Sequence, residues 1–427
     1  MKHAVIAAPE FPPANTAAAH RSRLFATFLP RYGWRPTVLT VREDQIEGPL
    51  DQDLRKLLPA EVEMVRTSAV PVRPFRVVGD MGLRCLWHHR RALERLCREG
   101  KKPDLLFIPG PPWFMFLLGP FFLKRCGIPY VLDYIDPWIS DWTGEAPFLT
   151  KRWAYHRAAK LYEGRVLRHA AHVTAVSEGI LEDLRKRYPF LSIGTCTAMP
   201  YGGNPDDFEA VRRLGVKPPD FDPSDGNFHV CFTGALQPRG FEILKAVFSA
   251  ARLVRERRPD LFRKMRLRFY GTSNLTWGRD QCRVLPLAKE WGLEKSVTEM
   301  PQRIPYLQSL AVQANAALNL VMGSWERYYH ASKLYSCLLA GRPLIAVCHA
   351  EASIVHVLRN LGMDGAVIFS SPDELSGKAG ELCEKMVKLL ERREVEFKPD
   401  MDRFEPYSAA GVTRVLAGVF DKAAGET

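Results

Sequence analysis

The sequence has few of the residue patterns that build disulfide or metal sites. Its nine cysteines form no C-x-x-C pair, their number is odd, and several lie inside apolar runs. This usage is typical of reduced thiols in the core of a cytosolic protein rather than of a disulfide framework. Three Asp-x-Asp pairs lie in polar, loop-like sequence instead of at a buried strand end: Asp51/Asp53, Asp220/Asp222 and Asp400/Asp402. We therefore expect neither disulfides nor a metal site.

Common nucleotide-binding and hydrolase motifs are also missing. No G-x-G-x-x-G follows the first predicted strand, where "APEFPPANTAAAH" stands instead, and this argues against a dinucleotide-dependent dehydrogenase. Neither a P-loop nor a G-x-S-x-G sequence occurs. The chain is basic, but no recognition motif accompanies the charge, so we expect no nucleic-acid partner and no resident cofactor.

Uninterrupted membrane-length apolar segments are lacking as well. The stretch from Leu105 to Leu123 carries no charge, but prolines and a glycine break it near its start. A strand over 105–108, a turn and a short buried helix is the better interpretation. The N-terminus begins a strand at once and has no signal-peptide pattern, so we expect a cytoplasmic protein.

What is present indicates a globular protein of several domains. The 427 residues are 46% hydrophobic and 25% charged, and at roughly 150 residues per domain two or three domains are expected. The formal net charge is +12. This excess favours partners that carry phosphate, such as phosphorylated small molecules or an anionic membrane.

Short apolar runs alternate with helical patterns along the chain. The predicted strands are 3–8, 36–41, 104–109, 130–135, 172–177, 228–234, 266–271, 297–301, 317–321, 343–347 and 366–369. Helical patterns include 17–31, 83–98, 151–169 and a final one near 406–422. Strands that are apolar throughout are typical of parallel sheets covered on both faces. The segment 200–227 is rich in Pro, Gly and Asp, which predicts a linker or a long surface loop.

This pattern predicts two tandem doubly wound α/β, or Rossmann-like, domains. We place the boundaries at 1–200, 201–400 and a C-terminal helical segment over 401–427. In such domains ligands bind at the carboxyl ends of the strands.

A candidate anion site follows the strand over 228–234. The strand ends at Gly234, a short loop contains Arg239, and a helix begins near Phe241 with Lys245 one turn further on. Helix N-termini and cations together bind anions, and a strand-end glycine permits close backbone approach. The alternative is a plain strand–helix turn with a solvated arginine.

Lys333 opens the segment "KLYSCLLAGRPLI" at the start of a predicted helix. A cation there is unfavourable for the helix dipole, so structure alone does not require it. A bound phosphate between the dipole and the ammonium would explain it. The alternative is a solvated lysine whose aliphatic stem covers apolar surface.

Two carboxylates end the strand over 130–135, and Asp136 occupies the position expected of a group at the ligand crevice. It could act as a general base, accept a hydrogen bond from a sugar hydroxyl, or cap the following turn. Trp138 and Trp142 could form a platform for a sugar ring or be core aromatics.

The helix over 83–98 is amphipathic and rich in arginine on its flanks. Such helices lie on anionic membranes, but a core-packed helix with a solvated face has the same pattern.

Taken in order, these segments resemble those of the family 4 glycosyltransferases, which have the two-domain GT-B fold. "PEFPPANTAAAHRSRLFATFLPRYGWRPTVLTV" looks like the family's opening strand, loop and helix, and "AAHVTAVSEGILEDL" and "PYGGNPDDF" match the end of the first domain. "FTGALQPRGFEILKA" is similar to the phosphate-binding turn of the second domain, and "SKLYSCLLAGRPLIAV" to its nucleotide-binding helix and strand. The resemblance covers nearly the whole chain.

The resemblance implies a retaining, metal-independent transfer from a nucleotide-sugar donor, with the acceptor in the first domain and the donor in the second. The last helix would cross back to the first domain. The residues implied at the nucleotide are Gly234, Arg239, Lys245, Ile304, Lys333, Leu334 and Ser336. Those implied near the reacting sugar are Glu326 and His330, with Asp136 on the acceptor side.

Some positions depart from the family pattern. Tyr328 and Ser336 stand where the family commonly has two glutamates, and Trp113 stands where its branch often has a histidine. Two hypotheses follow. The first is a hexosyltransferase that uses a hydrophobic or lipid-linked acceptor in polysaccharide or glycolipid biosynthesis, at the inner face of the cell membrane. The second is a catalytically inactive relative that binds a sugar nucleotide or a partner.

Overall fold

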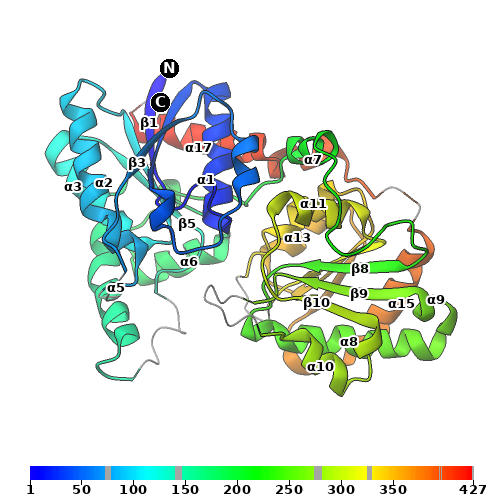
Figure 1. Cartoon of the computed structure of the whole chain (residues 1–427). Coiled ribbons are helices and arrows are strands. Elements are labelled where there is room, and N and C mark those ends of the chain that lie inside the picture. Colours follow the sequence, from blue (N-terminus) through cyan, green and yellow to red (C-terminus); the bar gives the residue numbers. More distant parts are fainter. Residues whose placement is uncertain are drawn as a thin grey trace. The chain divides into compact units, whose positions relative to one another are not determined.

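The computed structural model describes residues 1–72, 78–139, 147–273, 281–324, 329–393, 395 and 397–425. The chain forms two compact domains (Figure 1). The first domain comprises Met1–Tyr201 and Ala409–Thr427, and the second comprises Gly202–Ser408. The segment that returns to the first domain thus begins at Ala409, later than the position 401 that the sequence suggested.

The first domain contains a seven-stranded sheet in the order β3-β2-β1-β4-β5-β6-β7. All its strand pairs are parallel. The strands are β1 (Lys2–Ala7), β2 (Trp34–Val41), β3 (Glu63–Thr67), β4 (Leu105–Gly110), β5 (Tyr130–Tyr134), β6 (His172–Ala175) and β7 (Cys196–Ala198). Its helices are α1 (Ala17–Phe28), α2 (Met81–Arg98), α3 (Leu118–Cys126), α5 (Lys151–Leu167), α6 (Glu178–Arg187) and α17 (Ala409–Ala423). Short 3₁₀ helices are η1 (Leu29–Tyr32), η2 (Glu43–Gln45), η3 (Gln52–Leu57), η4 (Trp113–Leu117) and η5 (Ile193–Thr195).

The second domain contains a six-stranded parallel sheet in the order β10-β9-β8-β11-β12-β13. The strands are β8 (Phe228–Thr233), β9 (Met265–Tyr270), β10 (Val297–Met300), β11 (Leu318–Met322), β12 (Leu344–His349) and β13 (Ala366–Phe369). The helices are α7 (Pro205–Arg213), α8 (Phe241–Arg257), α9 (Pro259–Lys264), α10 (Val284–Glu290), α11 (Tyr306–Asn315), α12 (Lys333–Leu339), α13 (Ser353–Asn360), α14 (Pro372–Gly377), α15 (Ala379–Glu391) and α16 (Met401–Phe404). Its 3₁₀ helices are η6 (Pro238–Gly240), η7 (Glu294–Ser296) and η8 (Glu405–Tyr407).

The predicted α/β class with two Rossmann-like domains is confirmed by these sheets. The central strands β4, β5, β6, β8, β11 and β12 are buried along their whole length. This burial explains their uninterrupted apolar sequences, because helices cover both faces of each sheet. The strands that sequence reasoning missed, β3 and β7, lie at the two edges of the first sheet, where β3 is largely exposed and β7 is half-buried. They therefore carry no continuous apolar run.

The apolar stretch from Leu105 forms β4, η4 and α3, as predicted, and none of the described helices is long and apolar enough to cross a membrane.

The segment 200–227 is not purely a linker, because α7 lies within it. Pro205 occupies the first turn of this helix, and the Asn204 side chain accepts a hydrogen bond from the Asp206 N–H. Both features favour helix initiation.

The C-terminal helix α17 packs on the first domain beside α1, as Figure 1 shows at the red and blue ends of the chain. The rings of Trp34 and Phe420 meet edge to face, with their centroids 5.2 Å apart. Asp421 accepts hydrogen bonds from the Lys2 ammonium at 2.9 Å and from the Trp34 indole at 3.1 Å. These contacts fix the helix to β1 and β2.

A buried ion pair joins several elements of the first domain. Arg21 of α1 donates to both oxygens of Asp133 in β5, at 2.8 and 3.0 Å. The same guanidinium donates to the carbonyl oxygens of Met199 and Pro200, and Thr174 of β6 donates to Asp133 at 2.7 Å. Both charged side chains are fully buried. Each therefore depends on the other for charge compensation.

We predict that Asp133→Ala lowers the free energy of unfolding by about 3–5 kcal/mol, because it leaves a buried guanidinium without its counter-ion. Urea titration of the intact chain, followed by tryptophan fluorescence, measures the change. Asp44→Ala is the matched control, since it removes an exposed aspartate that pairs with Arg42, and it is expected to cost about 1 kcal/mol or less. Equal losses in the two variants would contradict the structural role of the buried pair.

Candidate functional site

The candidate site lies at the carboxyl ends of β8 and β11 in the second domain. These strands are neighbours in the sheet, and the strand order reverses between them. In doubly wound folds such a point leaves a crevice in which ligands bind.

Gly234 and Lys333, which are far apart in the sequence, meet at this point. Gly234 follows β8, and Lys333 is the first residue of α12. A Cβ atom on Gly234 would lie 2.9 Å from the Lys333 Nζ and 3.1 Å from its Cε. The Lys333 ammonium therefore lies close to Gly234, in the space that a side chain would occupy. A side chain at position 234 would displace it.

The Lys333 ammonium sits in an unfavourable electrostatic environment. Burial, and secondarily the positive charge of Arg303, lower the pKa of Lys333 to about 8. Within the described part of the chain no carboxylate pairs with this ammonium, and no side chain accepts a hydrogen bond from it. A bound anion would supply the missing counter-charge. Arg303 is a residue that sequence reasoning missed, although it adjoins the predicted Ile304.

Glycines bring the neighbouring loops close together. A Cβ on Gly240 would lie 3.3 Å from Leu236 Cδ1 and 3.7 Å from the Gly323 oxygen, and one on Gly323 would lie 3.0 Å from the Val347 oxygen. Gly240 precedes α8, whose first turn has no side-chain cap. No side chain of the cap position competes with an anion at this helix start, and the helix dipole favours an anion there.

Two arginines lie at the loop after β8, one within it and one that contacts it from the start of α10. Arg239 lies in η6 and is half-buried, one residue before the helix start. Arg283, which sequence reasoning did not identify, donates to the Leu236 oxygen at 3.1 Å and so braces the loop. Lys245 does not join this group, because it is exposed and its ammonium pairs with Glu242 at 2.8 Å.

The remaining residues predicted at the nucleotide are largely engaged in packing. Ile304 is buried with Cys231, Tyr270 and Val312. Leu334 is fully buried, and its N–H donates to the Ala331 oxygen. The Ser336 hydroxyl donates to the Lys333 carbonyl oxygen at 3.0 Å, inside its own helix.

His330 is held on both sides of its ring. Its Nδ1 lies 2.5 Å from the Ser353 hydroxyl, and its Nε2 lies 2.7 Å from the Tyr335 hydroxyl. The imidazole is nearly buried, so its orientation is fixed by these two contacts. Glu326, the other residue predicted near the reacting sugar, lies outside the described residues.

Asp136 belongs to the first domain, where it follows β5 and is exposed. The indole N–H of Trp113 donates to its backbone oxygen at 3.2 Å. Trp138 is a core residue, in edge-to-face contact with Phe114 and Phe116. Trp142 lies outside the described residues. The described ranges contain no group of three or more His, Cys, Asp or Glu side chains that could hold a metal ion.

Comparison with known proteins agrees with this architecture. Residues 16–202 match the family model of the glycosyl transferase 4-like domain. No curated protein matches the chain.

Solved structures of the same fold cover essentially the whole chain. A glycosyltransferase from Rickettsia africae is 12% identical, with a TM-score of 0.61 over 100% of this chain and 99% of its own. Anabaena HepE in complex with UDP and glucose is 12% identical, with a TM-score of 0.60 over 98% and 99%. A UDP-forming α,α-trehalose-phosphate synthase from Burkholderia vietnamiensis is 11% identical, with a TM-score of 0.66 over 99% and 99%.

At such low identity these structures establish the fold, and the family match concerns residues 16–202. Together they confirm the resemblance that the ordered sequence segments suggested. Residues 16–202 match the model of the glycosyl transferase 4-like domain, and the chain as a whole has the two-domain GT-B fold of these solved structures.

Proposed function

We propose that the protein transfers a hexose, with retention at the anomeric carbon, from a nucleotide-sugar donor to a hydrophobic or lipid-linked acceptor in polysaccharide or glycolipid biosynthesis. One observation carries the proposal. The half-buried Lys333 has no counter-ion among the described residues and lies against Gly234. Gly234 stands at the end of β8, where the strand order of the parallel sheet reverses and ligands of doubly wound folds bind. Similar structures that contain UDP or form it add support.

In this proposal the donor diphosphate occupies the space at Gly234, Arg239 and Lys333. The leaving nucleotide gains negative charge as the glycosidic bond breaks. Fixed cations and the first N–H groups of α8 would stabilise that charge more strongly in the transition state than in the ground state. The proposed site needs no divalent metal, because protein cations take this role.

The nucleoside would lie along the segment that contains Ile304 and over the start of α12. Ser336 offers it only a short hydroxyl, which already donates to the Lys333 carbonyl. The fully buried Leu334 would support the start of α12 from the core side. We therefore expect the ribose contact to be weak relative to the diphosphate contact.

On the reacting side, His330 would act through its fixed ring, and we assign Glu326 to the donor sugar from the sequence resemblance. Asp136, as an exposed carboxylate at a strand end of the first domain, would bind an acceptor hydroxyl or take its proton. Lys245, exposed and paired with Glu242, would assist only by long-range attraction.

We further propose that the first domain contacts an anionic membrane at the cytoplasmic face through α2. This helix packs into the core with Leu93 and Leu96, while Leu83 and Trp87 remain 39% and 51% exposed beside its arginines. An apolar surface flanked by cations is suited to a lipid headgroup region.

The alternative is a catalytically inactive relative that binds a sugar nucleotide or a protein partner. Ser336 and Trp113 motivate it, because each donates its hydrogen bond to a backbone oxygen of this chain rather than presenting a carboxylate or imidazole. A screen of sugar nucleotides with acceptors separates the two. Donor binding with turnover supports the transferase, and binding without turnover or hydrolysis supports the alternative.

We predict that Lys333→Ala and Arg239→Ala each weaken UDP binding by about 1.5–3 kcal/mol, the range for a charge-assisted hydrogen bond. Isothermal titration calorimetry measures the loss. Lys289→Ala, which removes an exposed lysine of the same domain, should leave the affinity unchanged. If both site variants bind UDP as tightly as the unmodified chain, the phosphate assignment is wrong.

The lowered pKa of Lys333 predicts a pH dependence. Below pH 8 the ammonium is charged and binds the diphosphate. As the pH rises through about 8, the unliganded lysine loses its proton, so UDP affinity should fall by up to about tenfold per pH unit. Lys333→Arg keeps its charge and should flatten the profile between pH 7 and about 9.5. An unchanged slope in that variant would assign the titration to another group.

A further inference from the structure

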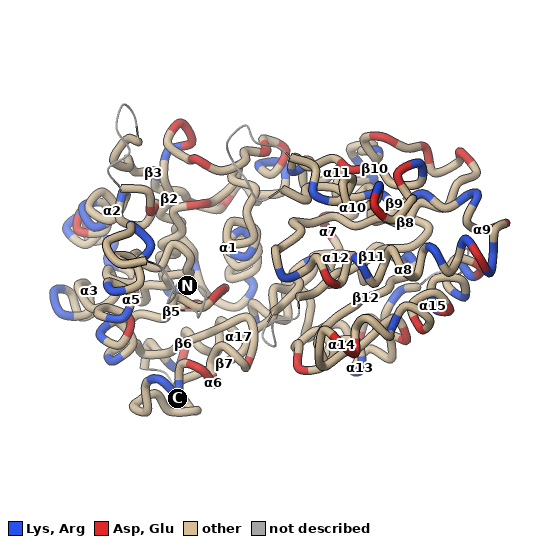
Figure 2. The backbone as a smooth tube through the Cα atoms, turned by 90° about the horizontal axis from the view of Figure 1, so that it is seen from below, with Lys and Arg blue, Asp and Glu red and all other residues tan. Residues whose placement is uncertain are grey.

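A basic pocket lies in the first domain, apart from all the residues discussed above as donor ligands. It has a volume of about 530 Å³ and lies between the edge strand β3 and helix α2. Its charged and titratable lining residues are Arg66, His88, Arg91, Glu94, Arg95 and Arg98. The spacing of 88, 91, 95 and 98 places these side chains along one face of the helix. Figure 2 shows basic positions along α2 in blue, and all of them are arginines.

Two arginines of the pocket are uncompensated. Arg91 lies over the ring of Trp87, with its Cζ 4.7 Å from the ring centroid. Arg98 reaches only the Glu94 main-chain oxygen, at 3.4 Å. Neither pairs with a carboxylate within the ranges that the structure describes. Both are exposed at the pocket and are free to bind an anion.

The single carboxylate of the lining does not neutralise them. Glu94 faces Arg90 at 3.2 Å and Arg125 at 3.7 Å, and neither of these arginines lines the pocket. Arg95 lies 3.8 Å from Glu99 in a largely exposed pair, which contributes little. The pocket therefore keeps a surplus of positive charge.

Helix stability alone does not explain this arrangement. Cations in the last turn of a helix are favoured by its dipole, which accounts for Arg95 and Arg98. Arg91 lies about two turns before the helix end, so the dipole does not account for it. Arg66 comes from the strand across the pocket and pairs with Glu43 at 3.2 Å, so the surplus charge comes from the helix arginines. Unpaired cations that line one hollow indicate a ligand of opposite charge.

We propose that this pocket binds the phosphate group of a ligand, either a phosphomonoester or a diphosphate. Guanidinium groups bind phosphate with two parallel hydrogen bonds, and several of them favour a multiply charged anion over a single carboxylate. The phosphate can belong to a soluble molecule or to a lipid headgroup. The site lies in the first domain and does not depend on the proposed donor site.

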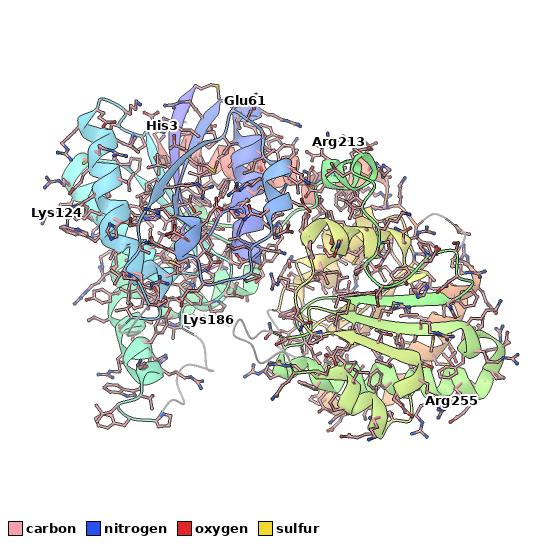
Figure 3. The ribbon with its side chains drawn as sticks, viewed as in Figure 1. His3, Glu61, Lys124, Lys186, Arg213 and Arg255 are labelled. Carbon is pink, nitrogen blue, oxygen red and sulfur yellow. The ribbon has the colours of Figure 1, made fainter. Side chains whose placement is uncertain are left out.

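The test is a titration of inorganic pyrophosphate into the full chain carrying Lys333→Ala, which weakens the donor site. Calorimetry at about 0.15 M salt suppresses diffuse attraction between exposed charges. Adding Arg91→Gln and Arg98→Gln should lower the pyrophosphate affinity by about tenfold or more, because charge-assisted hydrogen bonds are lost. The control adds Lys124→Gln and Lys186→Gln, two exposed lysines of the same domain (Figure 3), and should retain the affinity.

Vesicles distinguish the two sources of phosphate. If the ligand is a lipid, the chain should sediment with phosphatidylcholine vesicles that contain phosphatidic acid, and either the pocket variant or excess pyrophosphate should abolish this. If the ligand is soluble, pyrophosphate binds while the vesicles do not. Equal losses in the pocket and control variants, or no binding of either probe, would overturn the proposal.

Discussion

The buried pair between Arg21 and Asp133 is the interaction on which the first domain depends. It connects α1 to the middle of the sheet and to the carbonyl oxygens of Met199 and Pro200, where the chain leaves the domain. A guanidinium so far from water is tolerated only because its counter-ion and acceptors are all in place. The pair also determines the roles of two nearby carboxylates. Asp133 is committed to structure, whereas Asp136 emerges at the strand end, exposed and suited to a ligand.

The second domain contains a half-buried cation in the opposite situation. Lys333 is pressed against the Gly234 backbone, has no counter-ion among the described residues, and has a lowered pKa. A folded chain that keeps such a group at a strand end retains unfavourable electrostatic energy, which an anion would relieve. The same comparison of compensated and uncompensated cations applies to α2, where Arg90 and Arg125 share Glu94 while Arg91 and Arg98 remain available.

Much of the fold could be predicted because the buried strands are apolar along their whole length, and the order of strands and helices restricts the topology to doubly wound sheets. The edge strands β3 and β7 could not, since their exposed residues follow no apolar pattern. Within the candidate site, Gly234 and Lys333 were predicted from local signals, a strand-end glycine and a cation at a helix start. Arg283 and Arg303 carry no such signal. Their relevance depends on which loops the sheet brings together.

The sequence by itself determined the class of fold, the ordered segments typical of a glycosyltransferase, and the candidate residues at strand and helix ends. These properties depend on local hydrophobicity and on short motifs. Only the tertiary structure decided that Lys333 lies on Gly234, that Trp138 is a core residue, that Lys245 pairs with Glu242, and that arginines of β3 and α2 share a pocket. The physical reason is that contact, burial and charge compensation depend on which distant segments the sheets bring side by side.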